Sequence, residues 1–599
     1  MRTSIASVCL SGGLVEKLHA CAEAGFDGIE IMDADLIAAY ESPEEIRALC
    51  HRLGLTIDLF QPFRDFEAVD EATFADNMRR ARAKFEVMQR LGADMMLLCS
   101  NVATATTPDF DIAATQIGAL ADLAAEYGID IAYEALAWGR YVSDYRDAWD
   151  IVQRADRANL GVCLDSFHIL SRGHDPAGIA EIDPDKLFFL QLADAPRMDL
   201  DVLSWSRHHR LFPGEGDFDL IDFLSHVILA GYRGPLSLEV FNDTFRQTDV
   251  TRTAAHALRS LHWLYDRTAA QNDWTDLQLD APQPPCAIDF VEVSGEDLSA
   301  VERTLSQLGF TFGGRHRTKA VRLWEAGDAR VILNEQVRTP GSRLVGLGFE
   351  VGDAAAAARR AHAIGAPQVF RRTYAGDYEL PAVASPDGTE VYWNSRTAAE
   401  SWLDEFEGRV PLGEDTAETA LHGVIDHLNV AYPWQEFDEA VLFNTSVLAL
   451  DAEPASDVPG PRGLVRSQVM RTADGAVRLA MNLAPPTAPE LPRHVAIRVD
   501  DAVSAARRAR ARGLAFLPMP SNYYDDLDAR FGLEPDFLAE LRELNLLYDR
   551  DEQGSFIHFY TPTIGDIFWE VVERRGTYDG YGAASAPVRL AAQRGGPLL

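Results

Sequence analysis

Over its first half the chain alternates short apolar runs with longer segments in which apolar residues recur every three or four positions. The longer segments, such as 14–25 and 113–128, have helical periodicity and end at a glycine. Eight apolar runs between them are predicted to be strands: 3–10, 28–32, 56–63, 95–100, 130–135, 160–167, 187–194 and 235–241. Eight strands, each followed by a helix, predict an α/β fold with a closed (β/α)8 barrel, and a doubly wound open sheet is the alternative.

The pattern changes after a polar, proline-rich segment at 271–286, which has the composition of a linker. The residues from 287 to 334 alternate as strand, helix, strand, strand, and similar units begin near 344, 423 and 493. Four such units predict an internally repeated α+β region in two halves. We therefore expect a barrel domain over 1–270 and a second domain over 287–599.

Composition narrows the class of protein. The formal net charge is −37 and no run of Lys or Arg interrupts it, so nucleic acid and anionic membranes are disfavoured as partners. The six cysteines are scattered without CxxC spacing, as expected of reduced core residues in a cytoplasmic protein. No segment has the length of a signal peptide or a membrane span. These features favour a cytoplasmic, soluble enzyme or binding protein and leave a homo-oligomer open.

Four polar residues stand at the ends of apolar runs five to eight: Glu134, Asp165, Gln191 and Glu239. In a parallel barrel the carboxyl ends of the strands meet at one rim, where active sites lie. Three carboxylates and an amide oxygen at that rim suit a hard or borderline divalent cation such as Mg²⁺, Mn²⁺ or Co²⁺. The alternative is that each residue is a polar strand end paired with a nearby loop.

Candidate catalytic residues follow these strand ends. His168 lies three residues after Asp165, and an imidazole at this position suits general acid or base catalysis. The alternative is a purely structural role. Arg64 follows the third run, and the loop after the seventh carries Arg207, His208, His209 and Arg210. Guanidinium groups at the rim would be suited to bind a substrate carboxylate. The alternative is that these residues lie on a solvent-exposed loop without a binding role.

The motifs IAYE, CLDSFH, LQLAD, RLFPGEGDFD and LSLEVFN, in this order, resemble the xylose-isomerase-like TIM barrels. Fused to a repeated second region, the pattern resembles the bacterial two-domain 3-dehydroshikimate dehydratases. The resemblance implies Glu134, Asp165, Gln191 and Glu239 as metal ligands, His168 as the acid or base, and Arg210 as a substrate clamp. It also implies formation of protocatechuate in quinate and shikimate catabolism, by enolisation at a metal-bound ketone and loss of water.

The second region carries its own candidate metal site. Two histidines and a glutamate, His427, His494 and Glu570, stand at repeat-equivalent strand positions of its later half. Two histidines and one carboxylate are the ligand set of non-haem Fe(II) sites. The segments IDHLNV, RHVAIRVD and FWEVVERRGTYDGYG resemble the vicinal oxygen chelate fold, built from repeated βαβββ units, and 4-hydroxyphenylpyruvate dioxygenase in particular. That resemblance implies Fe²⁺ or another divalent metal here, and Ser467 and Asn482 as substrate-binding residues.

The leading hypothesis is a metal-dependent hydro-lyase acting on 3-dehydroshikimate. A sugar isomerase or epimerase would use the same barrel metal and base, and an active second domain would make the protein bifunctional. The alternative outside the enzymes is a ligand sensor, in which both domains bind a ligand without catalysing a reaction.

Overall fold

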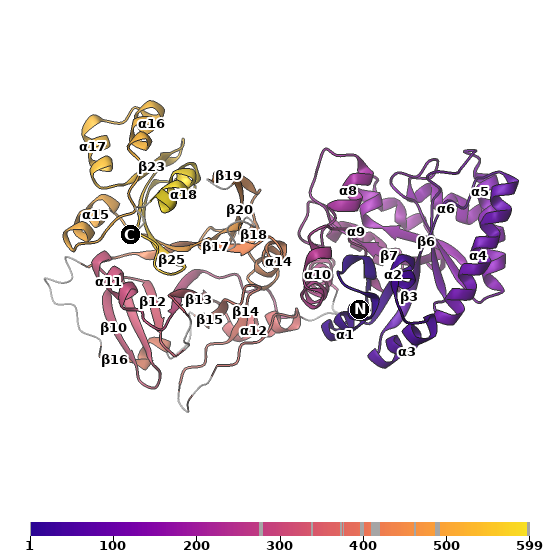
Figure 1. The fold of residues 1–599 in the computed structure, drawn as a ribbon, viewed down its shortest axis with the longest axis horizontal. Helices are drawn as coiled ribbons and strands as arrows, with labels where there is room; N and C mark the ends of the chain where they lie inside the picture. The colour runs from indigo at the N-terminus through magenta and orange to yellow at the C-terminus, as the bar shows by residue number, and fades with distance from the viewer. Residues whose placement is uncertain are drawn as a thin grey trace. The chain divides into compact units, whose positions relative to one another are not determined.

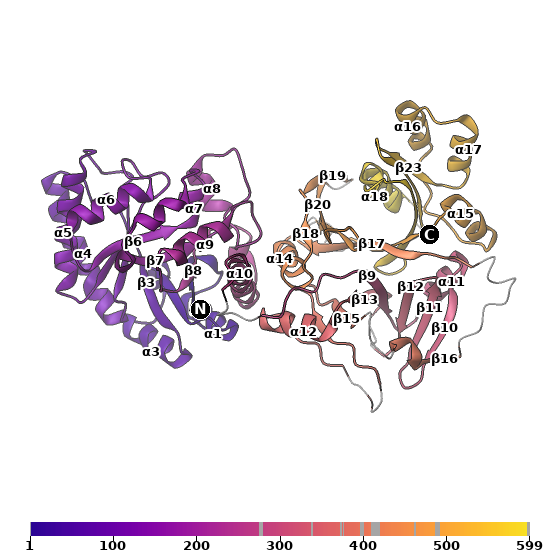
Figure 2. The same cartoon turned by 180° about the vertical axis from the view of Figure 1, so that it is seen from behind.

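The computed structural model of the chain contains two compact units, Met1–Gln278 and Leu279–Leu599 (Figures 1 and 2). The structure describes residues 2–274, 279–336, 340–371, 374, 377–395, 401–408, 420–460, 463–484 and 491–595. Residues 275–278 of the expected linker lie outside these ranges. Before them helix α10 ends at Gln271, and after them strand β9 begins at Ala287.

The first unit is a closed barrel of eight parallel strands, paired in the order β1 to β8, and confirms the predicted fold. Its strands are β1 Thr3–Ala6, β2 Gly28–Met32, β3 Thr56–Phe63, β4 Met95–Cys99, β5 Asp130–Glu134, β6 Leu160–Asp165, β7 Leu187–Leu192 and β8 Leu236–Leu238. Its helices are α1 Leu14–Ala24, α2 Asp33–Ala38, α3 Pro43–Leu53, α4 Glu71–Leu91, α5 Phe110–Ala125, α6 Tyr145–Ala155, α7 Ser166–Leu170, α8 Val202–His208, α9 Leu220–Leu229 and α10 Val250–Gln271.

Several strands are shorter than the apolar runs that predicted them. β6 ends at Asp165, because the Asp165 side chain accepts hydrogen bonds from the first backbone N–H groups of α7 and starts that helix. Ser166 and Phe167 are therefore helical, although they belong to the predicted strand. β8 ends at Leu238, so Glu239 is the first residue beyond it. The candidate site residues thus lie where strands stop.

The barrel interior is filled rather than hollow. Apolar side chains from five strands or their ends form a plug inside it, which contains Leu59, Leu97, Cys99, Ala132, Leu136, Cys163 and Phe189. A larger apolar core lies between the strands and the surrounding helices. Because the plug closes the interior, polar chemistry is confined to the carboxyl ends of the strands.

The second unit contains two mixed sheets, as expected of the vicinal oxygen chelate fold. One sheet has the order β14-β15-β13-β9-β12-β11-β10-β16, and the other has the order β18-β20-β21-β17-β22-β25-β24-β23, with β19 paired to β20. The strands are β9 Ala287–Ser294, β10 Thr311–His316, β11 Val321–Ala326, β12 Ala329–Asn334, β13 Arg343–Val351, β14 Ala382–Ala384, β15 Glu390–Ser395, β16 Phe406–Glu407, β17 Val424–Pro433, β18 Asp451–Ala452, β19 Ser456–Gly460, β20 Gly463–Arg471, β21 Arg478–Ala484, β22 Arg493–Arg498, β23 Leu547–Arg550, β24 Gly554–Tyr560 and β25 Ile567–Gly576.

Helices cover these sheets, and apolar side chains of both sheets join in one core. The helices are α11 Ser299–Leu308, α12 Ala354–Ala363, α14 Phe437–Val447, α15 Ala502–Ala511, α16 Ser521–Phe531, α17 Pro535–Glu543 and α18 Ala586–Gly595. The hydrophobic pattern had not indicated β10, whose sequence TFGGRH contains two glycines. The strands that carry the His427, His494 and Glu570 triad, β17, β22 and β25, match β9, β13 and β15 of the first sheet in their order of pairing.

None of the described helices is long and apolar enough to cross a bilayer. All six cysteines are free thiols, and five of them are buried.

Two glycines of the barrel should respond oppositely to alanine. In α5, a Cβ added at Gly118 would lie 3.8 Å from the nearest atom, an ordinary contact, so Gly118→Ala should stabilise the barrel by about 0.5–1 kcal/mol. In β6, a Cβ at Gly161 would lie 2.3 Å from the Phe188 ring, so Gly161→Ala should destabilise it by about 1–3 kcal/mol. Chemical denaturation of the barrel measures both changes, and the same sign for both would contradict this account.

Candidate active site and metal centre

The barrel carries a buried acidic cluster at the carboxyl ends of its last four strands. Glu134 and Asp165 are the final residues of β5 and β6, Gln191 is the penultimate residue of β7, and Glu239 follows β8. All four side chains are at most 5% exposed. Ligand atoms of Glu134, Asp165 and His168 lie within 4.8 Å of one another. The barrel therefore brings Glu134, Asp165 and Glu239 into one polar cluster through His168 and Arg210, whereas the contacts of Gln191 are with Glu30 and Cys163.

Glu134 has an unused carboxylate oxygen. Its Oε1 is buried without a hydrogen-bond partner, and its Oε2 accepts a hydrogen bond from the Cys99 thiol at 3.3 Å. Burial, followed by repulsion from Asp165 and Glu239, raises the pKa of Glu134 well above its usual range. Burying a charged carboxylate oxygen that has no hydrogen-bond partner destabilises the folded state, unless a proton or a cation neutralises the charge.

Arg210 supplies the positive charge of the cluster. This residue is 1% exposed, and its Nη1 lies 2.8 Å from Asp165 Oδ2 and 3.2 Å from Glu239 Oε2. The same nitrogen donates a hydrogen bond to the Glu239 carbonyl, and Nη2 donates one to Ser206 Oγ at 2.9 Å. Burial would raise the pKa of Asp165, but the guanidinium holds it below its usual value. Burial dominates at Glu239 and raises its pKa to about 7, against the attraction of Arg210.

His168 is a buried imidazole facing the carboxylates. Its Nδ1 accepts a hydrogen bond from the backbone N–H of Ala137 at 3.1 Å. Its Nε2 lies 3.5 Å from Glu134 Oε1 and 3.6 Å from Asp165 Oδ2. Burial lowers the pKa of His168 to about 3, so the ring is neutral at pH 7. Because Nδ1 accepts a hydrogen bond, the neutral ring carries its proton on Nε2, which faces the cluster and lies 3.3 Å from Arg210 Nη2.

Gln191 is held by a carboxylate that the sequence analysis missed. Glu30 in β2 is fully buried, and its Oε2 accepts hydrogen bonds from Gln191 Nε2 and Gln61 Nε2, both at 2.6 Å, while Ser237 donates to its Oε1. Burial raises the pKa of Glu30 well above its usual range. Gln191 commits its amide nitrogen to Glu30, and its carbonyl oxygen accepts a hydrogen bond from the Cys163 thiol at 3.6 Å and keeps a second lone pair for a ligand. The only signal in the sequence was one acidic residue inside the apolar run GIEIM.

Two further arginines line a small cavity beside this cluster. Arg64 and Arg207 border a cavity of about 10 Å³ together with Glu134, Trp138 and His168. Neither arginine forms an ion pair with a carboxylate among the described residues, and Arg64 Nε is buried without a partner. Burial, followed by repulsion from Arg64, lowers the pKa of Arg207. His208 lies outside the cavity and pairs with Asp243 at 3.0 Å, and His209 does not line the cavity either.

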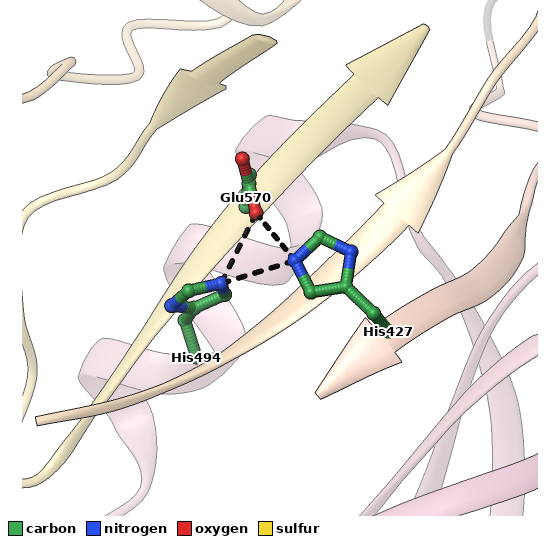
Figure 3. Close-up of side chains that lie close together, drawn as sticks. All are labelled: His427, His494 and Glu570. Carbon is green, nitrogen blue, oxygen red and sulfur yellow. Dashed lines mark hydrogen bonds and ion pairs between the residues drawn. The ribbon is translucent and has the colours of Figure 1, made fainter. Parts of the chain in front are cut away.

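The second unit brings His427, His494 and Glu570 together in a compact triad (Figure 3). Glu570 Oε2 lies 3.1 Å from Nε2 of each histidine, and the two Nε2 atoms are 3.3 Å apart. All three side chains are buried. A single shared proton cannot satisfy three converging acceptor atoms at once, whereas a divalent cation can. The geometry is therefore suited to a divalent metal held by two imidazoles and one carboxylate.

Outer residues orient the triad. Asp426 Oδ2 contacts His427 Nδ1 at 2.9 Å and is itself paired with Arg574 at 2.7 Å. His558 Nδ1 contacts Glu570 Oε1 at 2.6 Å. Burial would lower the pKa of His427, but its bonds to Asp426 and Glu570 raise it to about 9. The sequence analysis had not assigned a role to Asp426, although its position directly before His427 was a usable signal.

A third cluster of potential ligands, His316, Asp377 and Glu405, lies in the first half of the second unit. Glu405 pairs with Arg317 at 3.1 Å and Asp377 pairs with Lys319 at 3.1 Å. Because basic side chains already neutralise these carboxylates, the cluster serves as an ion-pair network.

Comparison with known proteins gives consistent matches over both units. Residues 18–266 match the family model of the xylose isomerase-like TIM barrel, and residues 279–405 match the N-terminal model of hydroxyphenylpyruvate dioxygenase. The chain is 43% identical to a 3-dehydroshikimate dehydratase of Pseudomonas aeruginosa, over 99% of this chain and 98% of that protein. It is 40% identical to a 3-dehydroshikimate dehydratase of Pseudomonas putida, over the same shares. A solved fusion of a xylose isomerase-like TIM barrel with a 4-hydroxyphenylpyruvate dioxygenase is 38% identical, with a TM-score of 0.89 over 99% of this chain and 100% of that one.

Replacing Arg210 should measure how much its ion pairs contribute to the stability of the barrel. Arg210→Gln leaves Asp165 and Glu239 buried without their counter-charge, so it should lower the free energy of unfolding by about 3–5 kcal/mol in the presence of EDTA. Arg207→Gln removes the same charge three residues away without breaking an ion pair, and should cost about 1 kcal/mol or less. Chemical denaturation measures both variants, and equal losses would contradict the central role given to Arg210.

Proposed function

The chain belongs to the family of 3-dehydroshikimate dehydratases, and on that premise we propose that its barrel converts 3-dehydroshikimate to protocatechuate and water. The family membership confirms the resemblance expected from the sequence. The observation that carries the proposal is the buried cluster of Glu134, Asp165, His168 and Glu239 at the barrel rim, in a chain alike to these relatives over its full length. We propose quinate and shikimate catabolism as the setting of this reaction, on the basis of the family resemblance alone.

We assign Glu134, Asp165, Gln191 and Glu239 as the residues that hold a divalent metal in the barrel. The donor set fits such an ion: three carboxylates and an amide carry only oxygen ligands, and Glu134 Oε1 has no partner. When bound, a divalent cation supplies a Lewis acid for the ketone oxygen of the substrate. Arg210 shares Asp165 and Glu239 with this site, and each carboxylate oxygen has more than one lone pair to offer.

The reaction requires removal of the C4 proton, which is acidic because it neighbours the C3 ketone, and departure of the C5 hydroxyl. We place His168 at the departure of the C5 hydroxyl, as a donor from Nε2, because Nδ1 accepts the Ala137 N–H and the neutral ring therefore carries its proton on Nε2, which faces the cluster. Loss of water then leads toward an aromatic ring, which makes the conversion irreversible in practice. A positioned imidazole contributes about 10²–10⁴-fold to such a step.

Arg64 and Arg207 are the better candidates for binding the substrate carboxylate. Arg210 is committed to Asp165, Glu239 and Ser206, so its donors are not available to a ligand. Arg64 and Arg207, by contrast, are half-buried, border the cavity and have no carboxylate partner within the described ranges. A cavity of about 10 Å³ has room for roughly one water molecule, so the substrate must displace side chains at this rim.

In the second unit we propose that His427, His494 and Glu570 hold Fe²⁺ or another divalent metal. The donor set, two imidazoles and one carboxylate, fits metals of that class. Asp426 and Arg574 position His427, an outer arrangement of the kind that fixes ligating histidines. The two proposed metal sites share no ligand, so each unit can hold its metal separately.

The defining experiment follows the ultraviolet absorbance of protocatechuate after 3-dehydroshikimate is added to the full chain with Mg²⁺, Mn²⁺ or Co²⁺. Glu134→Gln should lower metal affinity, measured by titration calorimetry, and turnover by at least about 10–100-fold, the loss caused even by outer ligand partners. Glu126→Gln, an exposed residue of the same unit, is the matched control. Absence of an aromatic product from the wild type would instead favour a sugar isomerase or epimerase.

The arginine assignment is tested by the Michaelis constant. Loss of a charge-assisted hydrogen bond to the substrate carboxylate weakens binding by about 1.5–3 kcal/mol, roughly 10–100-fold. Arg207→Gln and Arg64→Gln should therefore raise KM by about tenfold or more while changing kcat much less. Arg197→Gln, an exposed arginine in the loop after β7, should leave both constants unchanged. An unchanged KM in both rim variants would show that another residue binds the substrate carboxylate.

A further inference from the structure

The segment that joins β3 to α4, residues 64–69, carries Arg64 and follows a strained path. It belongs to no helix or strand, yet residues 66–69 are buried. Asp65 and Ala68 have φ angles of 56° and 58°, in the left-handed region that residues other than glycine rarely adopt. Each such residue costs about 1–3 kcal/mol and keeps its conformation only where the surroundings enforce it. The segment is therefore fixed by contacts from other elements.

Two amide side chains from neighbouring helices bind the backbone of this segment. Asn77 of α4 donates hydrogen bonds to the carbonyls of Asp65 and Phe66, at 2.9 and 3.0 Å. Gln116 of α5 binds both backbone groups of Val69, accepting from its N–H at 3.1 Å and donating to its carbonyl at 2.8 Å. These bonds give partners to buried backbone groups of a segment that lies outside the strands of the barrel.

Glu67 ties the segment to the next two strands of the barrel. Its Oε1 accepts hydrogen bonds from the backbone N–H of Asn101 at 2.6 Å and from the Tyr133 hydroxyl at 3.0 Å. Its carbonyl accepts a further bond from Asn101 Nδ2 at 2.8 Å. Asn101 lies just after the end of β4, and Tyr133 precedes Glu134 in β5. One residue thus joins the chain around Arg64 to the strand that ends in a proposed metal ligand.

The Glu67 carboxyl is buried at a cost to stability. The residue is 2% exposed, and its Oε2 is buried without a hydrogen-bond partner, beside a cavity of about 10 Å³. Burial raises the pKa of Glu67 to about 7, since the charged form is poorly solvated there. Strained backbone and poorly satisfied polar groups concentrate at sites where function requires a fixed geometry. Glu67 therefore serves more than the packing of this segment.

We propose that Glu67 is a positioning residue for the barrel reaction, which fixes segment 64–69 so that Arg64 meets the carboxylate of the substrate. This role rests on the proposed function, in which Arg64 binds that carboxylate. Arg64 borders the cavity beside the acidic cluster, and its carbonyl accepts a hydrogen bond from Arg80 of α4 at 3.4 Å. Its backbone is thus held by α4 directly and by β4 and β5 through Glu67. A displacement of about 1 Å at a substrate-binding group can lower activity by roughly 10²-fold.

Steady-state kinetics of the full chain with 3-dehydroshikimate and a divalent metal tests this role. Glu67→Ala frees the segment and should raise KM by about tenfold, the lower limit for loss of one charge-assisted contact, while changing kcat much less. Glu67→Gln keeps the Oε1 acceptor for Asn101 and Tyr133, so it should retain the wild-type KM. Glu86→Ala, at an exposed position of α4, is the matched control. A KM for Glu67→Ala equal to that of the wild type or of Glu67→Gln would overturn the proposal.

A double-mutant cycle shows whether Glu67 acts through Arg64. If it does, Glu67→Ala combined with Arg64→Gln should raise KM no further than Arg64→Gln alone, because the guanidinium that the segment positions is already absent. Multiplied effects of the two substitutions would mean that Glu67 acts independently of Arg64, and would contradict the assignment. Glu67→Asp, which retains the carboxyl but draws it back by one methylene, replaces Glu67→Ala if that variant does not fold.

Hydrogen exchange separates the hold on this segment from the reaction. Without substrate or metal, the backbone amides of residues 64–69 should exchange faster in Glu67→Ala than in the wild type, and Glu67→Gln should leave their exchange unchanged. Unchanged exchange in Glu67→Ala would overturn the proposal whatever the kinetics show. If the wild type forms no protocatechuate but exchange increases as expected, the proposed function fails and the hold of Glu67 on the Arg64 segment stands.

Discussion

The ion pairs of one buried guanidinium with two carboxylates hold the barrel site together. Asp165 ends β6 and Glu239 follows β8, and without a counter-charge these two buried carboxylates would repel each other. Arg210 lies between them with every contact made to the protein, and it keeps Asp165 ionised in spite of burial. Glu134 is the member of the cluster that Arg210 leaves unsatisfied, and its unpartnered oxygen is where an added cation would gain most.

This arrangement explains why the barrel needs two kinds of positive charge. A permanent one, Arg210, allows the acidic cluster to fold in the absence of metal. The proposed divalent cation would be an exchangeable one, and when bound it would supply a Lewis acid for the substrate ketone. The remaining arginines, Arg64 and Arg207, repel each other at the cavity edge and are available to an anionic substrate. Balancing the buried carboxylates and binding an anionic substrate are thus roles of different arginines.

The second unit balances the charge of its buried carboxylates with a different set of groups. There the central carboxylate, Glu570, is flanked by His427, His494 and His558, and the outer carboxylate Asp426 is neutralised by Arg574. Imidazoles replace most of the acidic ligands, so less negative charge is buried and a softer, borderline metal is favoured. The difference in donor chemistry keeps the two centres distinct in one chain.

The alternation of apolar runs and helical segments was sufficient to predict the barrel, since eight repeated strand-helix units close in only a few ways. It was also sufficient to select Glu134, Asp165, Gln191 and Glu239, because parallel topology brings all strand ends to one rim. Strand lengths were overestimated where a side chain, such as Asp165, caps a helix that the apolar pattern continues into. The glycine-rich strand β10 was missed because it lacks the alternation on which such predictions depend.

Only the tertiary structure decided which hydrogen-bond and ion-pair partners the candidate site residues have. Arg210 and Arg207 are three residues apart with the same side chain, yet Arg210 is paired with two carboxylates and Arg207 forms no ion pair among the described residues. Glu30 and Gln191 are separated by 161 positions, and Arg574 and Asp426 by 148. Hydrophobic periodicity encodes which residues are buried, but charge pairing acts over a few ångströms between segments whose separation in sequence carries no signal. The sequence determined which strands would end in polar residues, and only the folded chain determined which charges those residues would meet.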